Sequence, residues 1–181
     1  MELSKTNIEG IIIIKLQVFP DSRGTFTETY NKGGYIKTGI NSEFLQDNES
    51  VSKKGVIRGL HFQVPPFAQG KLVRVIKGRV LDVAVDIRKG SPTYGQYFSI
   101  ELCEENKLQL WIPEGFAHGF ASLTDNTIFS YKCTNIYNKE SERTILWNDK
   151  DLKINWNIEN PIISEKDITN AVKFKNFISP F

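Results

Sequence analysis

Short segments of alternating apolar and polar residues recur along the chain, and turn residues separate them. The clearest covers residues 80–87, where aliphatic side chains occupy every second position and Asp82 and Asp86 lie on the opposite face with Val80 and Ala84. Apolar residues on both faces predict a strand that is at least partly enclosed on each side. Similar strands are predicted for residues 11–18, 25–30, 71–76, 96–102, 107–112 and 127–134. Many short strands between Gly and Pro turns are typical of an all-β sandwich or barrel.

Helical character is confined to the end of the chain. Ser164 is followed three positions later by Asp167, which resembles a capping box and predicts a short helix over residues 168–174. The polar, Asn-rich stretch 138–161 contains Trp147 and Trp156 and is interpreted as loops and short pieces that pack on the main body.

Length and charge narrow the function classes. At roughly 150 residues per domain, the 181 residues predict one domain spanning 1–181. The formal net charge is +2, and no block of five like charges occurs, which argues against binding of nucleic acid or of a membrane surface. The longest aliphatic run, residues 11–14, is too short for a signal sequence or a membrane span, so we expect a cytoplasmic protein.

Several kinds of chemistry lack their sequence signals. Cys103 and Cys133 form no C-x-x-C pair and are interpreted as two buried, inert thiols. The motifs of dinucleotide binding, P-loop phosphate transfer, zinc proteases and elbow-type serine hydrolases are missing. A small molecule or a second copy of the chain is therefore the expected partner.

The chain contains two histidines, His61 and His118, which are the leading candidates for a base of near-neutral pKa. His118 belongs to a Pro-x-Gly-x-x-His segment that resembles the second motif of the cupin barrels. The first cupin motif normally supplies several metal ligands, but the corresponding segment here offers His61 alone. Two imidazoles and an unidentified carboxylate are too few for a metal assignment, so no metal is expected.

Longer motifs extend this resemblance. On eight segments the chain resembles the dTDP-4-dehydrorhamnose 3,5-epimerases: residues 58–63, 70–73, 82–88, 90–93, 112–120, 131–134, 146–149 and 164–167. The resemblance implies a cupin-type jelly-roll barrel that acts without metal or nicotinamide. The implied substrate is dTDP-4-dehydro-6-deoxyglucose, with inversion at C3 and C5 on the way to dTDP-L-rhamnose.

The resemblance also implies catalytic roles. His61 matches the family's base and Asp167 the carboxylate that orients it; Lys71 matches the lysine beside the sugar ketone, and Tyr131 the acid on the opposite face. Tyr137 is the second candidate for the acid. Three of these residues also have a purely structural interpretation. Asp167 would then be a helix cap, Lys71 a solvated strand lysine and Tyr131 a core aromatic residue.

Nucleotide and sugar contacts are carried over in the same way. They are Arg23, Phe26, Glu28, Gln46, Asp47, Asn48, Arg58, Lys71, His118, Tyr137, Glu142 and Lys166. Two phosphates require cations, and Arg23 and Arg58 are the leading candidates. An ideal strand would place Arg58 and His61 on opposite faces, so the two can share a site only if Gly59 bends or bulges the chain.

A homodimer is implied as well, with the N-terminal strand region bringing Arg23 or Phe26 to the neighbour's site. Three alternative functions stay open at this point. They are an epimerase that inverts one centre of a related 4-keto sugar nucleotide, a non-catalytic sugar-nucleotide binding module, and a metal-dependent cupin oxygenase with an unrecognised ligand set.

Overall fold

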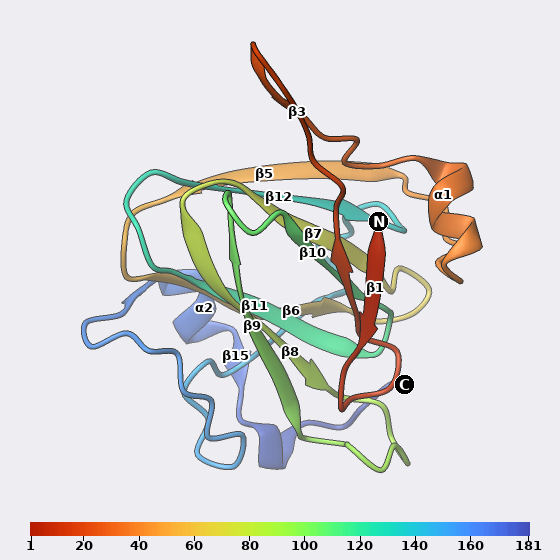
Figure 1. Ribbon diagram of the computed structural model, residues 1–181. Helices are drawn as coiled ribbons and strands as arrows, with labels where there is room; N and C mark the ends of the chain where they lie inside the picture. The colour runs from red at the N-terminus through yellow and green to blue at the C-terminus, as the bar shows by residue number, and fades with distance from the viewer.

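Two β-sheets face each other and form a barrel in the computed structural model, which describes residues 1–181 (Figure 1). The six-stranded sheet has the order β1-β2-β10-β7-β12-β5 and is antiparallel throughout. Its strands are β1 (Glu2–Lys5), β2 (Ile12–Lys15), β5 (Gln46–Ser52), β7 (Lys71–Lys77), β10 (Leu108–Ile112) and β12 (Thr127–Cys133).

The second sheet has the order β15-β13-β6-β11-β8-β9, and β14 also pairs with β6. Its strands are β6 (Val56–Gln63), β8 (Arg79–Asp86), β9 (Tyr97–Cys103), β11 (Phe116–Ser122), β13 (Glu142–Ile145), β14 (Ile162–Ile163) and β15 (Ala171–Val172). Two pairs in this sheet are parallel, β14 with β6 and β15 with β13, and the others are antiparallel. This arrangement is the jelly-roll barrel expected from the sequence.

Three apolar clusters hold the layers together. The first fills the barrel between the two sheets and includes Val73, Phe120 and Phe129. A second lies between the outer face of the second sheet and the C-terminal segments, and a third packs α1 (Lys32–Lys37) on the six-stranded sheet. Strand β8 contributes to the first cluster from one face and to the second from the other. The prediction that both faces of this strand are enclosed is therefore confirmed.

Five predicted strands are confirmed to within one residue at each end, namely β7, β8, β9, β10 and β12. Two predicted strands are too long. Residues 25–30 form a strand only to Phe26, because β4 (Gly24–Phe26) pairs with β3 (Phe19–Asp21) alone and lacks a further partner. Residues 11–18 form only β2, which pairs with β1 and β10 over four residues.

The predicted C-terminal helix over 168–174 is misplaced. Helix α2 covers Glu165–Thr169, and its N-cap is Ser164, whose hydroxyl accepts from the Asp167 N–H. Asn170 ends the helix, and the following residues pair with β13 before a 3-10 turn, η1 (Phe174–Asn176). Backbone pairing with β13 thus takes the chain out of the helix. None of the helices is long and apolar enough to span a membrane.

Candidate active site

A bulge in β6 brings Arg58 and His61 to the same side of the sheet. The register with β11 pairs Arg58 with Phe120 and His61 with His118, so three steps along β6 match two along β11. An extra residue in one strand shifts the alternation of its side chains. Both residues line one cavity, while Leu60 between them faces the outer apolar cluster. The expected bulge at Gly59 is present.

Two glycines make this crossing possible. Gly59 has φ +132°, and a Cβ built on it would lie 2.5 Å from Gly119 Cα. A Cβ built on Gly119 would lie 2.6 Å from the Arg58 carbonyl oxygen. The backbones of β6 and β11 touch here because both residues lack side chains. The glycines therefore set the position of the histidine that follows.

His61 and Asp167 form a hydrogen-bonded pair, with His61 Nε2 2.7 Å from Asp167 Oδ1. The Gly59 N–H also points to Asp167 Oδ2, at 3.5 Å. Burial would raise the pKa of Asp167, but the hydrogen bond and charge of His61 outweigh it and hold that pKa below its ordinary value. An ionised carboxylate on Nε2 keeps a proton there and leaves Nδ1, which makes no hydrogen bond, free to accept one.

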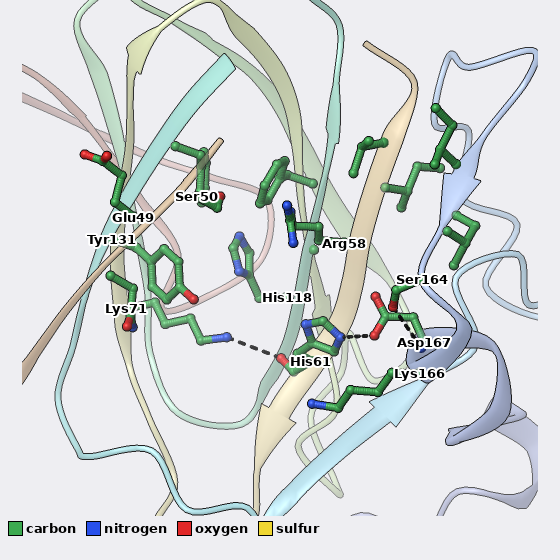
Figure 2. A pocket seen from close by; sticks show the side chains of 18 of the residues that line it. Glu49, Ser50, Arg58, His61, Lys71, His118, Tyr131, Ser164, Lys166 and Asp167 are labelled. Carbon is green, nitrogen blue, oxygen red and sulfur yellow. Dashed lines mark hydrogen bonds and ion pairs between the residues drawn. The ribbon is translucent and has the colours of Figure 1, made fainter. Parts of the chain in front are cut away.

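Lys71 and Tyr131 extend into the cavity from β7 and β12. Figure 2 shows Tyr131 and His61 on opposite sides of the cavity, with the Lys71 ammonium between them. Lys71 Nζ donates to the His61 carbonyl oxygen at 3.5 Å and lies 6.0 Å from the centre of the Tyr131 ring. Burial lowers the pKa of Lys71 and raises that of Tyr131. Tyr131 is therefore held in its protonated form, able to donate a proton.

A second histidine–carboxylate pair lies deeper in the barrel. His118 Nε2 is 2.9 Å from Asp82 Oδ2, across the neighbouring strands β11 and β8. Both side chains are buried, and Asp82 Oδ1 has no hydrogen-bond partner in the chain. Burial lowers the pKa of His118 even though Asp82 opposes this shift. The imidazole therefore favours the neutral form, with Asp82 fixing its orientation.

The cavity around these groups has a volume of about 590 Å³. A second cavity of about 310 Å³ adjoins it, and five residues line both: Asn48, His61, Lys71, Tyr131 and Glu142. Together they form a polar cleft long enough for a ligand that is larger than a single sugar ring.

Strand β5 supplies one polar wall of the cleft. Gln46, Asn48 and Ser50 alternate along β5 and line the cavities. Asn48 and Ser50 reach the first cavity and Gln46 the second, and Gln46 Nε2 donates to Asn48 Oδ1 at 2.9 Å. Asp47 does not line either cavity and forms an ion pair with Lys132 at 2.8 Å.

Glu142 accepts hydrogen bonds from two side chains at the mouth of the cleft. Its Oε2 accepts from Lys166 Nζ at 2.5 Å and from the Tyr137 hydroxyl at 3.1 Å. Burial would raise the pKa of Glu142, but the Lys166 ammonium and the Tyr137 hydroxyl outweigh it and lower that pKa. The structure thus brings Tyr137, Glu142 and Lys166 together at one edge of the cleft.

Besides Asp47, three of the predicted contact residues lie away from the cleft. Arg23 and Phe26 are on the β3–β4 hairpin, which projects from the barrel in Figure 1, and Glu28 follows it. The Phe26 residue is 67% exposed, and the Arg23 side chain is 88% exposed and paired with Asp21. Within one copy of the chain these side chains face solvent.

Sequence reasoning missed some of the residues that form the cleft. Ser50 lines the first cavity, and its buried hydroxyl has no partner in the chain. The alternation from Gln46 through Asn48 was the signal that could have identified it. Asp82, which the alternation of residues 80–87 assigns only to one face of a strand, pairs with His118. No group of three or more His, Cys, Asp or Glu side chains is placed to hold a metal ion.

Comparisons with known proteins agree with this geometry. The family model described as dTDP-4-dehydrorhamnose 3,5-epimerase matches residues 5–175. A dTDP-4-dehydrorhamnose 3,5-epimerase of Shigella flexneri is 53% identical over 175 residues, 96% of each chain.

Two solved structures are similar over nearly the whole chain. A dTDP-4-dehydrorhamnose 3,5-epimerase from Elizabethkingia anophelis has a TM-score of 0.91 at 51% identity and covers 97% of each chain. A dTDP-6-deoxy-D-glucose-3,5-epimerase from Legionella pneumophila, solved in complex with dTDP-4-keto-L-rhamnose, has a TM-score of 0.93 at 46% identity. It covers 98% of this chain and 94% of that one. The fold is the cupin-type jelly roll of these enzymes.

Proposed function

Because the chain belongs to the dTDP-4-dehydrorhamnose 3,5-epimerase family, we propose that it converts dTDP-4-dehydro-6-deoxy-D-glucose to dTDP-4-dehydro-L-rhamnose by inverting C3 and C5. The product serves dTDP-L-rhamnose synthesis and hence cell-surface polysaccharides. The observation that best supports the chemistry is the His61–Asp167 pair, whose free ring nitrogen adjoins a cavity that also holds Lys71 and Tyr131.

His61 is the proposed base. Hydrogens on C3 and C5 are weakly acidic because the C4 ketone can take up the charge that their removal leaves. His61 Nδ1 takes the proton, the C–H electron pair forms a carbon–carbon double bond, and the ketone oxygen becomes an enolate. Asp167 stabilises the imidazolium from the opposite ring nitrogen, at 2.7 Å.

Lys71 is the proposed stabiliser of that enolate. A preorganised cation at the position of developing charge is among the largest contributions to catalysis in a site sheltered from water. Burial penalises the Lys71 ammonium and lowers its pKa. An enolate beside it would compensate for that penalty, so the interaction is stronger in the transition state than with the neutral ketone.

Tyr131 is the proposed acid. Inversion requires a proton to return on the face opposite the base, and Tyr131 lies across the cavity from His61 in Figure 2. Its hydroxyl gives a proton to the enolate carbon, the double bond closes onto that proton, and the C4 ketone is restored. Half-exposed Tyr137, bonded to Glu142 at the mouth, is the second candidate for this role.

Cations and amides in the cleft suit the nucleotide. Arg58 donates from Nε to Ser52 Oγ at 3.2 Å and from Nη2 to the Val51 carbonyl oxygen at 3.4 Å, and its guanidinium forms no ion pair within the chain. Such a group is available for a phosphate, which it can bind through two donors at once. Lys166 supplies a further positive charge, and Gln46, Asn48 and His118 supply polar contacts along the cleft.

We also infer a cytoplasmic homodimer in which the β3–β4 hairpin serves the partner's cleft. The two free thiols, Cys103 and Cys133, suit a reducing compartment. Phe19 and Phe26 on the hairpin are exposed aromatic residues, which are typical of surfaces that are covered by a partner. Arg23 and Phe26 could then reach a phosphate or a base in the neighbouring site.

Mixing two inactive variants tests this arrangement. In a His61→Asn copy paired with an Arg23→Ala copy, one site would combine an intact His61 with an intact Arg23 from the partner. We expect co-refolded mixtures to be more active than either variant alone. If mixtures stay at the level of the separate variants while dimers form, Arg23 does not serve the partner's site.

The proposed reaction is tested by incubating the chain with dTDP-4-dehydro-6-deoxyglucose in deuterated water, with a coupled reductase to trap the product. Deuterium at C3 and C5 of an L-rhamno product is the expected result, and His61→Asn should abolish both labels with the fold intact. Label at one carbon would indicate a single-centre epimerase. Binding without label at either carbon would indicate a non-catalytic binding module.

A further inference from the structure

Gln63 is a buried amide at the end of β6 whose hydrogen bonds lead to the mouth of the cleft. It is 4% exposed, lies two residues after His61 and lines the second cavity with Tyr137. Its Nε2 donates to the carbonyl oxygens of Phe67 at 2.6 Å and Ile136 at 3.1 Å. Its Oε1 accepts from the Asn138 N–H at 2.7 Å. Both amide hydrogens are used, so this side chain is fully engaged.

Two of these bonds enclose Tyr137. Gln63 binds the residue before it and the residue after it, and the Tyr137 N–H itself donates to Gln46 Oε1 at 2.7 Å. Three successive backbone groups of one turn, residues 136–138 between β12 and β13, are thus held by side chains of β6 and β5, two strands that form the cleft. The peptide groups on both sides of the Tyr137 Cα are therefore held by hydrogen bonds from side chains.

The Tyr137 side chain is held much less firmly. It is about half exposed, and its hydroxyl makes one hydrogen bond, to Glu142. Glu142 stands opposite Gln63 in the register of β13 and β6 and lines both cavities. The direction of the Tyr137 ring into the mouth of the cleft therefore depends on where its backbone is placed, and Gln63 determines that placement.

We propose that Gln63 is a positioning residue for the reaction, which acts through Tyr137 by clamping the turn that carries it. The inference rests on the proposed function insofar as the cleft binds the ketosugar nucleotide. With the turn held, Tyr137 meets the bound sugar from one fixed direction. Without Gln63, the turn has one unsatisfied carbonyl oxygen, that of Ile136, and one unsatisfied N–H, that of Asn138, so the Tyr137 hydroxyl loses its fixed position beside Glu142.

A double-mutant cycle separates this role from general support of the fold. Gln63→Met keeps the length of the side chain and removes all three bonds. We expect it to lower kcat/KM about tenfold, mainly through KM, a fold-change on the scale of lost buried hydrogen bonds. In a Tyr137→Ala background the same substitution should change kcat/KM less than about twofold, because the residue it positions is absent.

Gln69→Met is the matched control. Gln69 Nε2 donates to the Asn135 carbonyl oxygen at 2.7 Å, one residue before the clamped groups, so its loss loosens the same loop without freeing the peptides that flank Tyr137. Its effect should be the same with and without Tyr137. If Gln63→Met does not yield folded protein, Gln63→Glu, which keeps the acceptor for Asn138, replaces it in the cycle.

Equal losses from Gln63→Met in both backgrounds would overturn the proposal, and so would an unchanged kcat/KM in the folded single variant. The wild-type chain, assayed alongside, keeps the two claims apart. If it binds the ketosugar nucleotide without turning it over, the proposed function fails, and the same cycle read on the dissociation constant still decides the role of Gln63.

Discussion

His61 Nε2 and Asp167 Oδ1 lie 2.7 Å apart although 106 residues separate them in the chain. His61 follows the β6 bulge, and Asp167 lies in the five-residue helix α2 that Ser164 caps. The Asp167 carboxylate is directed at His61 and the Gly59 N–H, while the Ser164 hydroxyl accepts from the Asp167 backbone. The cap and the carboxylate are thus separate features and can be tested separately.

Replacement of Asp167 by Asn should lower kcat by about 10²–10⁴-fold, the range of general-base contributions. An amide can donate to His61 Nε2 and thereby favour the tautomer whose proton sits on Nδ1, which is then unable to accept another. Steady-state kinetics of Asp167→Asn against Ser164→Ala checks this. Ser164→Ala removes the cap and should cost about 1 kcal/mol of stability with a much smaller effect on kcat. Equal kinetic damage from both changes would mean that Asp167 acts as a helix residue and not as the partner of the base.

Tyr131→Phe should separate proton removal from inversion. The base and the enolate stabiliser remain, so exchange of substrate hydrogen with deuterated solvent should continue, while epimerised product falls by at least about tenfold, as for the loss of a general acid. NMR of the recovered substrate and of the trapped product gives both rates. Tyr94→Phe, whose ring packs on Phe174, serves as the control and should retain both. A parallel loss of exchange and product would remove Tyr131 from the role of acid.

Gly119→Ala should destabilise the protein by about 2–4 kcal/mol, as expected for overpacking between two backbones. The added Cβ would meet the Arg58 carbonyl oxygen at 2.6 Å. The φ of Gly119 is not in the left-handed region, so the effect is steric. Gly33→Ala in α1 is the control. Its new Cβ has open space apart from Asn31 Oδ1 at 3.5 Å, and it should stabilise by up to about 1 kcal/mol. Denaturant unfolding of the two variants measures the difference, and equal midpoints would argue against a tight crossing of β6 and β11.

Asp86 should make stability depend on pH at the acid end. Its side chain is fully buried; burial acts to raise its pKa, but bonds from Arg88, Ser91 and Thr93 lower it to about 2. A carboxylate with a depressed pKa stabilises the fold above its ordinary pKa of 3.8, and this contribution is lost as pH falls toward 2. Asp86→Asn should therefore lower the free energy of unfolding by about 2 kcal/mol at pH 7. This difference should shrink as the pH falls below about 4.

Unfolding free energies of wild type and Asp86→Asn between pH 7 and pH 2 provide the measurement. Asp21→Asn is the control, because Asp21 is an exposed partner of Arg23 and should leave the unfolding midpoint unchanged. A constant difference between wild type and Asp86→Asn over the whole pH range would contradict the shifted pKa.

The sequence by itself determined the class of fold, the strands of the barrel wall and the family. Strands β7 to β10 and β12 alternate between an apolar interior and a second face, and burial of the apolar side chains dictates where they begin and end. The strands that carry most of the cleft, β5, β6 and β11, were not located from alternation. Their polar residues and glycines serve the site, so they break the pattern that apolar burial would impose.

Only the tertiary structure decided how the site is assembled. The β6 bulge turns Arg58 and His61 to one side, and it exists because Gly59 and Gly119 allow two backbones to touch. The pairs His61–Asp167 and His118–Asp82 join distant parts of the chain, which no local pattern encodes. The clamp of Gln63 on the turn of Tyr137 depends on the same long-range packing. Local sequence sets side-chain periodicity, whereas contact between remote residues is fixed by the way the sheets and the C-terminal segment pack together.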